Sequence, residues 1–418
     1  MRLLHTSDWH LGKKLYEIDF EQHHRLFLDW LLETIENERI DVLLIAGDIF
    51  DQAHPPKAAE RLYYDFLKKM YRSRCKQVIV TGGNHDSTGT LEAPKDVLEV
   101  INVSTIGAVN GDIQDQIIEI SDENGELEAV VAAVPFLRDK DIRKALAGES
   151  YDEKVLQIKE GIIRHYAQLG DYCAAEYSLE IPLIATGHLF VHGVSSDAES
   201  VREIQLGNLA GVEASMFHSR FDYVALGHIH KPQNVNAPMP VRYSGAPIAL
   251  SFSERNYEHS VTLIDTLKKP LNPEAILVPH FRELVSLNGT YEEIQIKLSV
   301  LNGDPKMPTL VELQFEEENH DLAILPKVDA LVEEVNKLTA TKGVHIARKR
   351  IHFSKATTGA DELFDQVVDI DSLTVGDIFE MRMEEEEIPD QTQEQLRMAF
   401  KEIQESLYQE AADEDTRA

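Results

Sequence analysis

The sequence predicts a layered α/β domain, followed by a small α+β module and a C-terminal helical tail. Over residues 1–270, short apolar runs alternate with stretches of helical periodicity, which is the pattern of sheets covered by helices. A Pro- and Lys-containing turn at 268–273 indicates a boundary. Because 418 residues are too many for one ordinary domain, we expect domains at 1–270 and 275–355 and a helical segment at 373–411.

The buried strands of the first domain are predicted from short apolar runs bounded by turn residues. These runs are Leu3–Leu4, Val42–Ala46, Val78–Val80, Val130–Val134, Leu183–Ala185 and Tyr223–Leu226. Between them, Phe27, Leu31 and Ile35 fall near one face of a predicted helix, and Glu60–Tyr71 predicts another.

The second module shows the same two periodicities in a shorter stretch of chain. Its predicted strands are Leu284–Leu287, Thr309–Phe315 and Val344–Phe353, and its predicted helices are Tyr291–Leu301 and Leu325–Leu338.

The tail predicts an amphipathic helix over 393–409, in which Leu396, Phe400, Ile403 and Leu407 share one face. Such a face binds a partner protein or packs back on its own chain, and the sequence leaves both open.

The charge balance limits how this chain can contact nucleic acid. Its formal net charge is −32, so its overall field repels a polyanion, and any DNA contact must come from local patches, bound metal ions or a partner subunit. Cys75 and Cys173 have no metal-type spacing, which favours a reducing cytoplasm over a disulfide scaffold. No signal peptide or membrane-spanning stretch is predicted, so we expect a soluble cytoplasmic protein.

Five short motifs carry the chemistry, and each follows a predicted strand. They are Asp8-Trp9-His10, Gly47-Asp48, Gly83-Asn84-His85-Asp86, Gly187-His188 and Gly227-His228-Ile229-His230. Ligands collect outside the carboxyl ends of strands in α/β sheets, and a glycine before the ligand lets the backbone turn sharply there. We therefore expect the five loops to converge on one cleft.

The residue types predict a site for two divalent metal ions. Water attack on a phosphodiester needs a nucleophile at neutral pH and neutralisation of phosphoryl charge, and two metal ions provide both. Carboxylate, imidazole and amide donors without thiolate favour Mn, with Mg as an alternative. The predicted ligands are Asp8, His10, Asp48, Asn84, His188, His228 and His230, with Asp48 bridging.

The other polar residues of these loops are assigned to the substrate side. His85 is expected to stabilise the transition state or protonate the leaving oxygen, with Asp86 orienting its imidazole. Asp51 either caps a turn or supports the metal ligands. Candidate DNA contacts are Lys13, Lys14, His54, Arg348 and Arg350, for which a solvated charged face is the alternative.

In this order, the motifs resemble those of the calcineurin-like metallophosphoesterase superfamily. Longer stretches narrow the resemblance to the SbcD nuclease subunits, and it weakens through 110–180 and after 280. These stretches are HTSDWHLGK (5–13), AGDIFD (46–51), GGNHDS (82–87), ATGHLF (185–190), VREIQLGNLAGVEASMF (201–217), GHIHKP (227–232) and YSGAPIALSFSE (243–254).

The resemblance implies a layered metallophosphoesterase β-sandwich flanked by helices, with a capping domain and a helical tail. It places the family's metal ligands on the seven residues named above and its catalytic histidine on His85. It further implies a homodimer that pairs with the coiled-coil ATPase SbcC through the tail. The implied activities are ATP-dependent 3′–5′ exonuclease cutting of double-stranded DNA, endonuclease cutting of single strands and opening of hairpins.

Two other enzyme classes use the same fold. A phosphoprotein phosphatase typically carries an Arg shortly after the second Asp motif and a GNHE tetrad, whereas this chain has Gln52 after Asp51 and has Asp86. A small-nucleotide phosphodiesterase needs neither the extra module nor the tail. A scaffold with a decayed site is disfavoured because no ligand position is missing.

Overall fold

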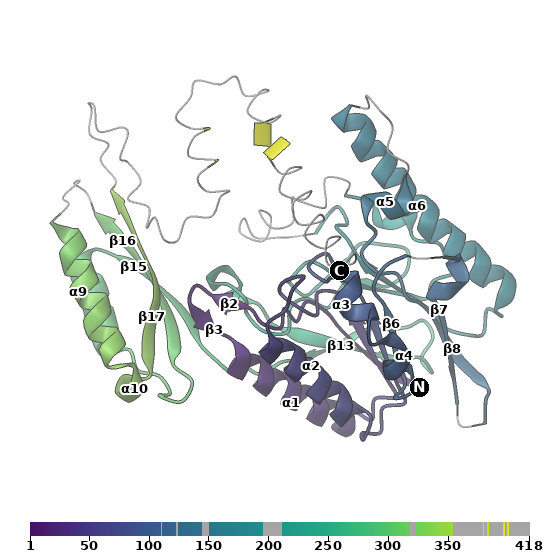
Figure 1. Ribbon diagram of the computed structural model, residues 1–418, viewed down its shortest axis with the longest axis horizontal. Coiled ribbons are helices and arrows are strands. Elements are labelled where there is room, and N and C mark those ends of the chain that lie inside the picture. Colours follow the sequence, from purple (N-terminus) through teal and green to yellow (C-terminus); the bar gives the residue numbers. More distant parts are fainter. Residues whose placement is uncertain are drawn as a thin grey trace. The chain divides into compact units, whose positions relative to one another are not determined.

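The computed structural model describes residues 1–109, 111–122, 124–143, 150–194, 211–317 and 323–353, together with Phe379, Met383, Leu396, Arg397, Ala399 and Phe400. The described chain forms two compact units (Figure 1). The first comprises Met1–Lys13 and Phe20–Pro279, and the second comprises Lys14–Asp19 with described residues from His280 onward.

Two mixed sheets form the first unit. One sheet has the strand order β14-β13-β1-β4-β5-β6. Strands β1, β4, β5 and β6 are parallel to one another, whereas β13 pairs antiparallel with both of its neighbours, β1 and β14. Its strands are β1 (Arg2–Thr6), β4 (Val42–Ala46), β5 (Gln77–Thr81), β6 (Val103–Ile106), β13 (Ser260–Asp265) and β14 (Glu274–Leu277).

The other sheet has the order β11-β12-β10-β9-β8-β7, with β8, β9, β10 and β12 parallel. Its strands are β7 (Ile117–Ser121), β8 (Leu127–Ala132), β9 (Leu183–His188), β10 (Tyr223–Gly227), β11 (Gln233–Val235) and β12 (Val241–Tyr243). All six strands predicted for this domain are present, and the predicted sandwich is confirmed.

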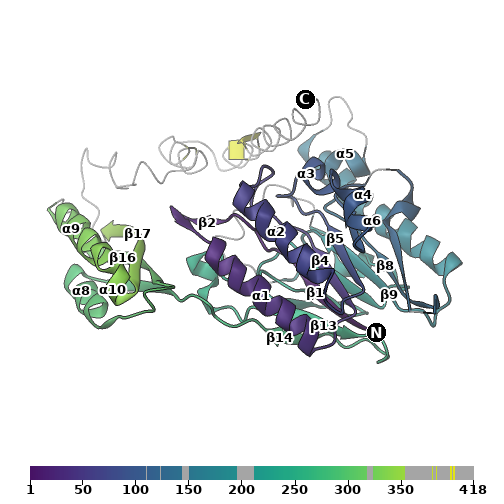
Figure 2. The ribbon, with the colours of Figure 1, turned by 60° about the horizontal axis from the view of Figure 1, so that its bottom comes forward.

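Side-chain alternation along the strands builds the core. Val42 and Leu44 of β4 pack against Val131 of β8 and Ala225 of β10, between the two sheets. The opposite face of the second sheet packs against Tyr166 and its neighbours on the long helix α6 (Tyr151–Glu176). The helices α1 (Glu21–Asn37) and α2 (Lys57–Met70) lie over the first sheet (Figure 2).

The shorter helices of this unit fill the connections. They are α3 (Thr88–Glu92), α4 (Lys95–Glu99), α5 (Asp139–Ile142) and the 3₁₀ turns η1 (Ile113–Gln116), η2 (Ala214–Met216) and η3 (Phe252–Asn256). No described helix is both long and apolar enough to cross a bilayer.

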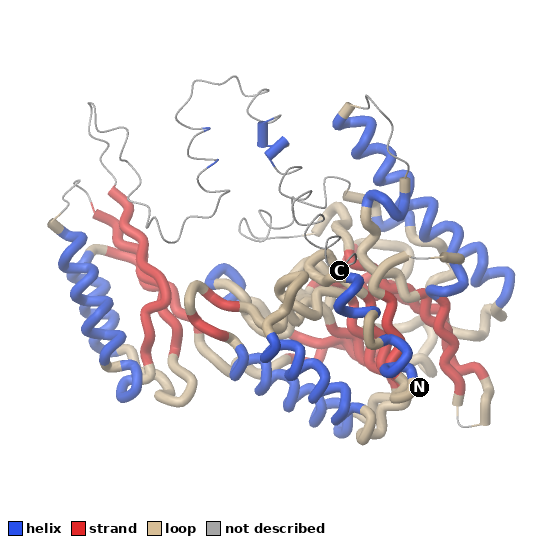
Figure 3. The backbone as a smooth tube through the Cα atoms, in the orientation of Figure 1, coloured by secondary structure: helices blue, strands red, loops and turns tan. Residues whose placement is uncertain are grey.

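The second unit is a parallel three-stranded sheet with helices on one face (Figure 3). It contains β15 (Leu284–Gly289), α8 (Tyr291–Val300), β16 (Thr309–Glu317), α9 (Ile324–Lys337), α10 (Thr339–Lys342) and β17 (Val344–Phe353), together with the hairpin strands β2 (Lys14–Leu15) and β3 (Ile18–Asp19). Ile294 of α8, Phe315 of β16 and Val328 of α9 meet in its core. The predicted α+β elements are confirmed.

The turn at 268–273 is not a domain boundary. It joins β13 to β14, which pair antiparallel in register Ser260 to Leu277, so the first unit continues to Pro279. The proline and lysine residues correctly predicted a turn at this place, but turn residues occur in hairpins as well as in linkers between domains.

Only part of the predicted tail helix lies in the described chain. The ring of Phe400 stacks on that of Phe379 with a centroid separation of 4.1 Å, and Leu396 is 39% exposed. Ile403 and Leu407 lie outside the described residues.

Candidate metal centre

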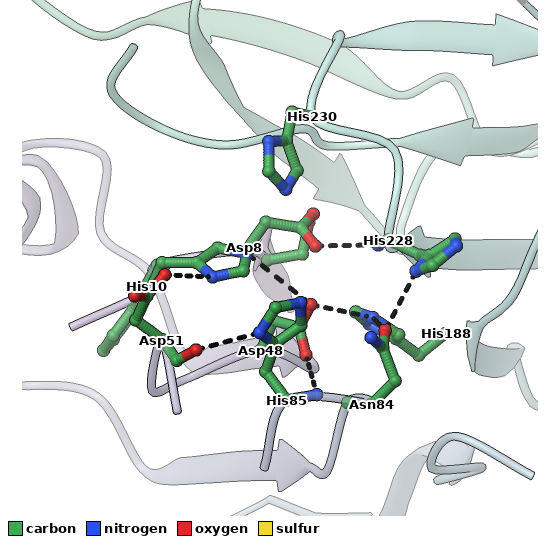
Figure 4. A network of polar contacts seen from close by, with 12 residues as sticks. Asp8, His10, Asp48, Asp51, Asn84, His85, His188, His228 and His230 are labelled. Atoms are coloured by element: carbon green, nitrogen blue, oxygen red, sulfur yellow. Dashed lines mark hydrogen bonds and ion pairs between the residues drawn. The ribbon is translucent and has the colours of Figure 1, made fainter. Parts of the chain in front are cut away.

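Five loops meet at the carboxyl ends of β1, β4, β5, β9 and β10 (Figure 4). Backbone hydrogen bonds join the first two loops: the Asp8 amide donates to the Gly47 carbonyl and the His10 amide to the Asp48 carbonyl, each at 3.0 Å. The His228 amide donates to Asp8 Oδ1 at 2.8 Å. The two sheets are therefore tied together where the predicted ligands lie.

Four of the predicted ligands have backbones in the left-handed region. Asp8, His10, Asp48 and His228 have φ of 54°, 47°, 52° and 93°. Positive φ is uncommon for residues other than glycine and costs on the order of 1–3 kcal/mol each. The surrounding hydrogen bonds hold these conformations, which turn the side chains toward one another.

Gly83 is required for close approach to the central carboxylate. A Cβ at this position would lie 2.1 Å from Asp48 Oδ1 and 2.3 Å from the Asp48 amide nitrogen. The sharp backbone turn that we expected at a glycine before a ligand occurs instead at Gly47, which has a φ of +87°. Glycines in these motifs thus have different purposes.

The predicted ligands form two groups. The donor atoms of Asp8, His10 and His230 lie within 4.8 Å of one another, and so do those of Asp48, His188 and His228. Asn84 belongs to the second group, because its Oδ1 lies 3.0 Å from both His188 Nε2 and His228 Nδ1. All seven predicted ligands are therefore brought together.

Asp48 lies between the two groups. Its Oδ2 is 3.5 Å from His10 Nε2 and 3.2 Å from His188 Nε2, and its side chain is 2% exposed. One carboxylate oxygen thus faces both donor groups, which suits a ligand shared by two cations.

The residues present fit two hard or borderline divalent ions. His10 Nε2 is buried and makes no hydrogen bond, which is costly unless a further group binds it. The donors are oxygen and imidazole nitrogen, with no thiolate in either group. An ion in each group would satisfy the orphaned nitrogen.

The protonation states that bind cations are favoured at Asp48 and His228 but not at His188, whose pKa rises to about 9 because the attraction of Asp48 outweighs the effect of burial. Burial alone would favour a neutral Asp48, but the adjacent His188, with His85 and His10, holds the pKa of Asp48 well below its usual value. Burial, reinforced by His188, lowers the pKa of His228 well below its usual value. An ionised carboxylate and a neutral imidazole are the forms that bind cations.

A second layer of acceptors orients the imidazoles. His10 Nδ1 lies 3.2 Å from Asp51 Oδ1, His230 Nδ1 lies 2.9 Å from Glu254 Oε1, and His188 Nδ1 lies 3.0 Å from the Ala46 carbonyl oxygen. Each contact leaves the other ring nitrogen for an ion. Asp51 thus contacts the predicted ligand His10, as one of its two predicted roles requires.

Glu254 is a site residue that the sequence argument did not assign. It is 3% exposed, and its Oε2 accepts from the Leu250 amide at 2.9 Å while its Oε1 faces His230. The only sequence signal was its place at the end of the stretch 243–254.

Asp86 does not orient His85, in contrast to our expectation. Its carboxylate accepts from the amides of Ile49, Gly83 and Phe50 at 2.9–3.1 Å and so fixes the turn between two ligand loops. His85 Nδ1 instead lies 2.9 Å from the Asp51 carbonyl oxygen. Adjacent side chains in a tight turn point in different directions, which adjacency in sequence cannot show.

The predicted DNA contacts are divided between the two units, with Lys13 and His54 in the first and Lys14, Arg348 and Arg350 in the second. Lys13 Nζ lies 3.4 Å from Asp51 Oδ1, while Lys14 and His54 are exposed. In the second unit, Glu312 Oε1 lies 3.8 Å from Arg348 Nη1 and 3.6 Å from Arg350 Nε. Arg348 also lies over the ring of Tyr16 at 4.9 Å. Its charge is thus partly neutralised within the unit.

Comparison with known proteins agrees with this geometry. Residues 1–232 match the calcineurin-like phosphoesterase family, and the chain belongs to it. Over 408 residues, it is 33% identical to the SbcD component of the SbcCD nuclease of Escherichia coli (strain K12), covering 96% of this chain and 97% of that protein.

Within that family, the chain belongs to the SbcD nuclease subunits. It is 37% identical to the SbcD protein of Rhodobacter capsulatus over 273 residues, and 34% identical to that of Bacillus subtilis over 270 residues. Each of these matches covers 63% of this chain and 66% of the relative. The fold, the site and these relatives define a hydrolase of phosphodiester bonds.

Proposed function

We propose that this chain is the metal-dependent DNA nuclease subunit of a complex with an SbcC-type ATPase. The proposed activities are 3′–5′ exonuclease cutting of double-stranded DNA, endonuclease cutting of single strands and hairpin opening, in DNA replication, recombination and repair. The observation that carries the proposal is Asp48 Oδ2, which lies 3.5 Å from His10 Nε2 and 3.2 Å from His188 Nε2.

Two bound divalent ions, for which we propose manganese with magnesium as the alternative, would supply a hydroxide nucleophile and neutralise phosphoryl charge. Asp8, His10 and His230 would hold one ion, Asn84, His188 and His228 would hold the other, and Asp48 would contact both. Carboxylate, amide and imidazole donors suit these metals.

His85 is proposed to protonate the leaving oxygen. Because a carbonyl oxygen only accepts, its contact at 2.9 Å requires the proton on His85 Nδ1. Nε2 is then the nitrogen available to substrate, and it must carry the proton that passes to the leaving oxygen. The His85 amide also donates to Asp48 Oδ1 at 3.0 Å, which fixes the ring's backbone beside the shared carboxylate.

The test compares His85→Ala with the unchanged chain and with His192→Ala, at an exposed position. We expect His85→Ala to retain both metal ions and to cut linear duplex and hairpin DNA about 10²–10⁴-fold more slowly, while His192→Ala cuts normally. Full activity of His85→Ala would reject the assigned role. Preferential hydrolysis of bis-nitrophenyl phosphate or a phosphopeptide over DNA would favour a small-nucleotide phosphodiesterase or a phosphatase instead.

The tail is proposed to bind the SbcC-type partner. Leu396 is 39% exposed, and burying a leucine or phenylalanine on a partner contributes roughly 1.5–3 kcal/mol. Removing the residues after 380 should leave the fold of the first unit intact and abolish partner binding, measured by near-UV circular dichroism and size-exclusion chromatography. Undiminished complex formation would refute this. We also propose a homodimer in the cytoplasm, with the partner carrying much of the DNA affinity.

A further inference from the structure

A cavity of about 550 Å³ lies in the first unit, beside the edge formed by β12 of one sheet and β13 and β14 of the other. Its lining includes Lys231, Arg242, Ser253, Asn256 and Ser260. Ligand pockets for small molecules have about this size. None of these residues belongs to the two metal-donor groups.

Arg242 is a half-buried cation whose partners are neutral. Its Nε donates to Thr262 Oγ1 of β13 at 3.1 Å, and its Nη1 donates to Asn234 Oδ1 at 2.9 Å. Over the described chain, no carboxylate pairs with it, although the sequence holds 73 acidic residues. Burial lowers the pKa of its guanidinium. A half-buried charge without a counterion is stabilised when an anion binds it.

Lys231 supplies a second cation to the same cavity. Its Nζ lies 5.6 Å from the centroid of the Tyr257 ring, and no ion pair within the described residues involves it. Glu258 also lines the cavity but pairs with neither cation across the described ranges. The cavity therefore has two positive charges that form no ion pair with the carboxylate in its lining.

Ser260 adds an independent sign of a missing ligand. The residue is 1% exposed, and its Oγ makes no hydrogen bond. Such orphaned buried hydroxyls are rare in folded proteins, because the unmade hydrogen bond costs about 1–3 kcal/mol. Together, a guanidinium fork, an ammonium and a hydroxyl form the donor set that recognises phosphate oxygens.

We infer that this cavity binds a phosphate group, either the terminal phosphate of a mononucleotide or free inorganic phosphate. Arg242 holds two of its oxygens, and Lys231 and Ser260 contact the others. The turn η3 forms one wall through Ser253 and Asn256 and carries Glu254, which contacts His230 at 2.9 Å. The phosphate site and the metal centre thus share one structural element while using different residues.

The test measures binding of inorganic phosphate and of deoxyadenosine 5′-monophosphate to the full-length chain by isothermal titration calorimetry. Measurements are made with manganese and after its removal by EDTA, so that binding at the metal centre is separated from binding in the cavity. Arg242→Gln and Lys231→Met are compared with Lys57→Met, a lysine that is 86% exposed on α2. A near-UV circular dichroism spectrum checks the fold of each variant.

We expect one saturable, EDTA-resistant site per chain. Arg242→Gln should weaken it at least tenfold and Lys231→Met severalfold, whereas Lys57→Met should leave it unchanged. Tighter binding of the nucleotide than of phosphate would identify a mononucleotide as the ligand, and equal binding would identify free phosphate.

The inference is overturned if no EDTA-resistant binding saturates, or if folded Arg242→Gln and Lys231→Met bind as the unchanged chain does. It is also overturned if the variants lose affinity for duplex DNA alone, because the cavity would then hold a strand backbone. If Arg242→Gln does not fold, Lys231→Met decides. Since the EDTA arm needs no nuclease activity, failure of the proposed function would leave its result unaffected.

Discussion

Replacing Glu254 by Gln tests whether the second layer of acceptors controls the metal centre. The carboxylate accepts from His230 Nδ1 at 2.9 Å and from the Leu250 amide at 2.9 Å. A glutamine has one accepting oxygen for these two donors. If that oxygen keeps Leu250, its NH₂ faces His230 Nδ1, and the ring proton must move to Nε2, the nitrogen needed for an ion.

The opposite orientation of the glutamine sets its NH₂ against the Leu250 N–H, which costs about 1–3 kcal/mol. In either orientation, we expect affinity for the manganese ion held by Asp8, His10 and His230 to fall about 10–100-fold, equivalent to about 1.4–2.8 kcal/mol. Calorimetric titration of manganese into metal-free protein measures this. Glu258→Gln, at an exposed position four residues along the chain, is the matched control. Unchanged manganese affinity in folded Glu254→Gln would refute the argument.

The remaining predictions concern the shared carboxylate and a buried histidine. Asp48→Asn should reduce bound manganese from two ions to at most one and slow DNA cutting on the order of a hundredfold. The control Asp65→Asn, at an exposed position, should change neither quantity. Elemental analysis measures the bound manganese, and a duplex-cutting assay measures the rate. Burial lowers the pKa of His165 from 6.5 to about 4. Between about pH 6.5 and 4, this histidine is therefore protonated in the unfolded chain but not in the folded chain. The free energy of unfolding then falls as the pH drops through this range. In His165→Gln, this fall should be smaller by roughly 3 kcal/mol in urea unfolding, and exposed His192→Gln should retain it; an unaltered pH dependence in His165→Gln would contradict the assignment.

The strands and the gathering of the candidate ligands could be predicted from the sequence because both depend on local patterns. Apolar runs such as Val42–Ala46 identify strands, and a ligand at a strand end is positioned by the sheet itself. Parallel neighbours then bring Asp8 and Asp48 together, even though forty residues separate them along the chain.

The supporting contacts could not be predicted, because they depend on turns whose geometry has no periodic signal. Glu254 reaches His230 through η3, and Asp86 turns toward three backbone amides while His85 turns toward Asp51. The ion pairing of Arg348 likewise depends on the pairing of β16 with β17, which sets Glu312 opposite it.

The central claim is that two cations share Asp48. Anomalous scattering from crystals of the full-length chain grown with manganese tests it most directly. We predict two peaks roughly 3.5–4 Å apart, each in contact with the Asp48 carboxylate, one also beside His10 and the other beside His188. A single peak, or two peaks of which only one touches Asp48, would contradict the claim.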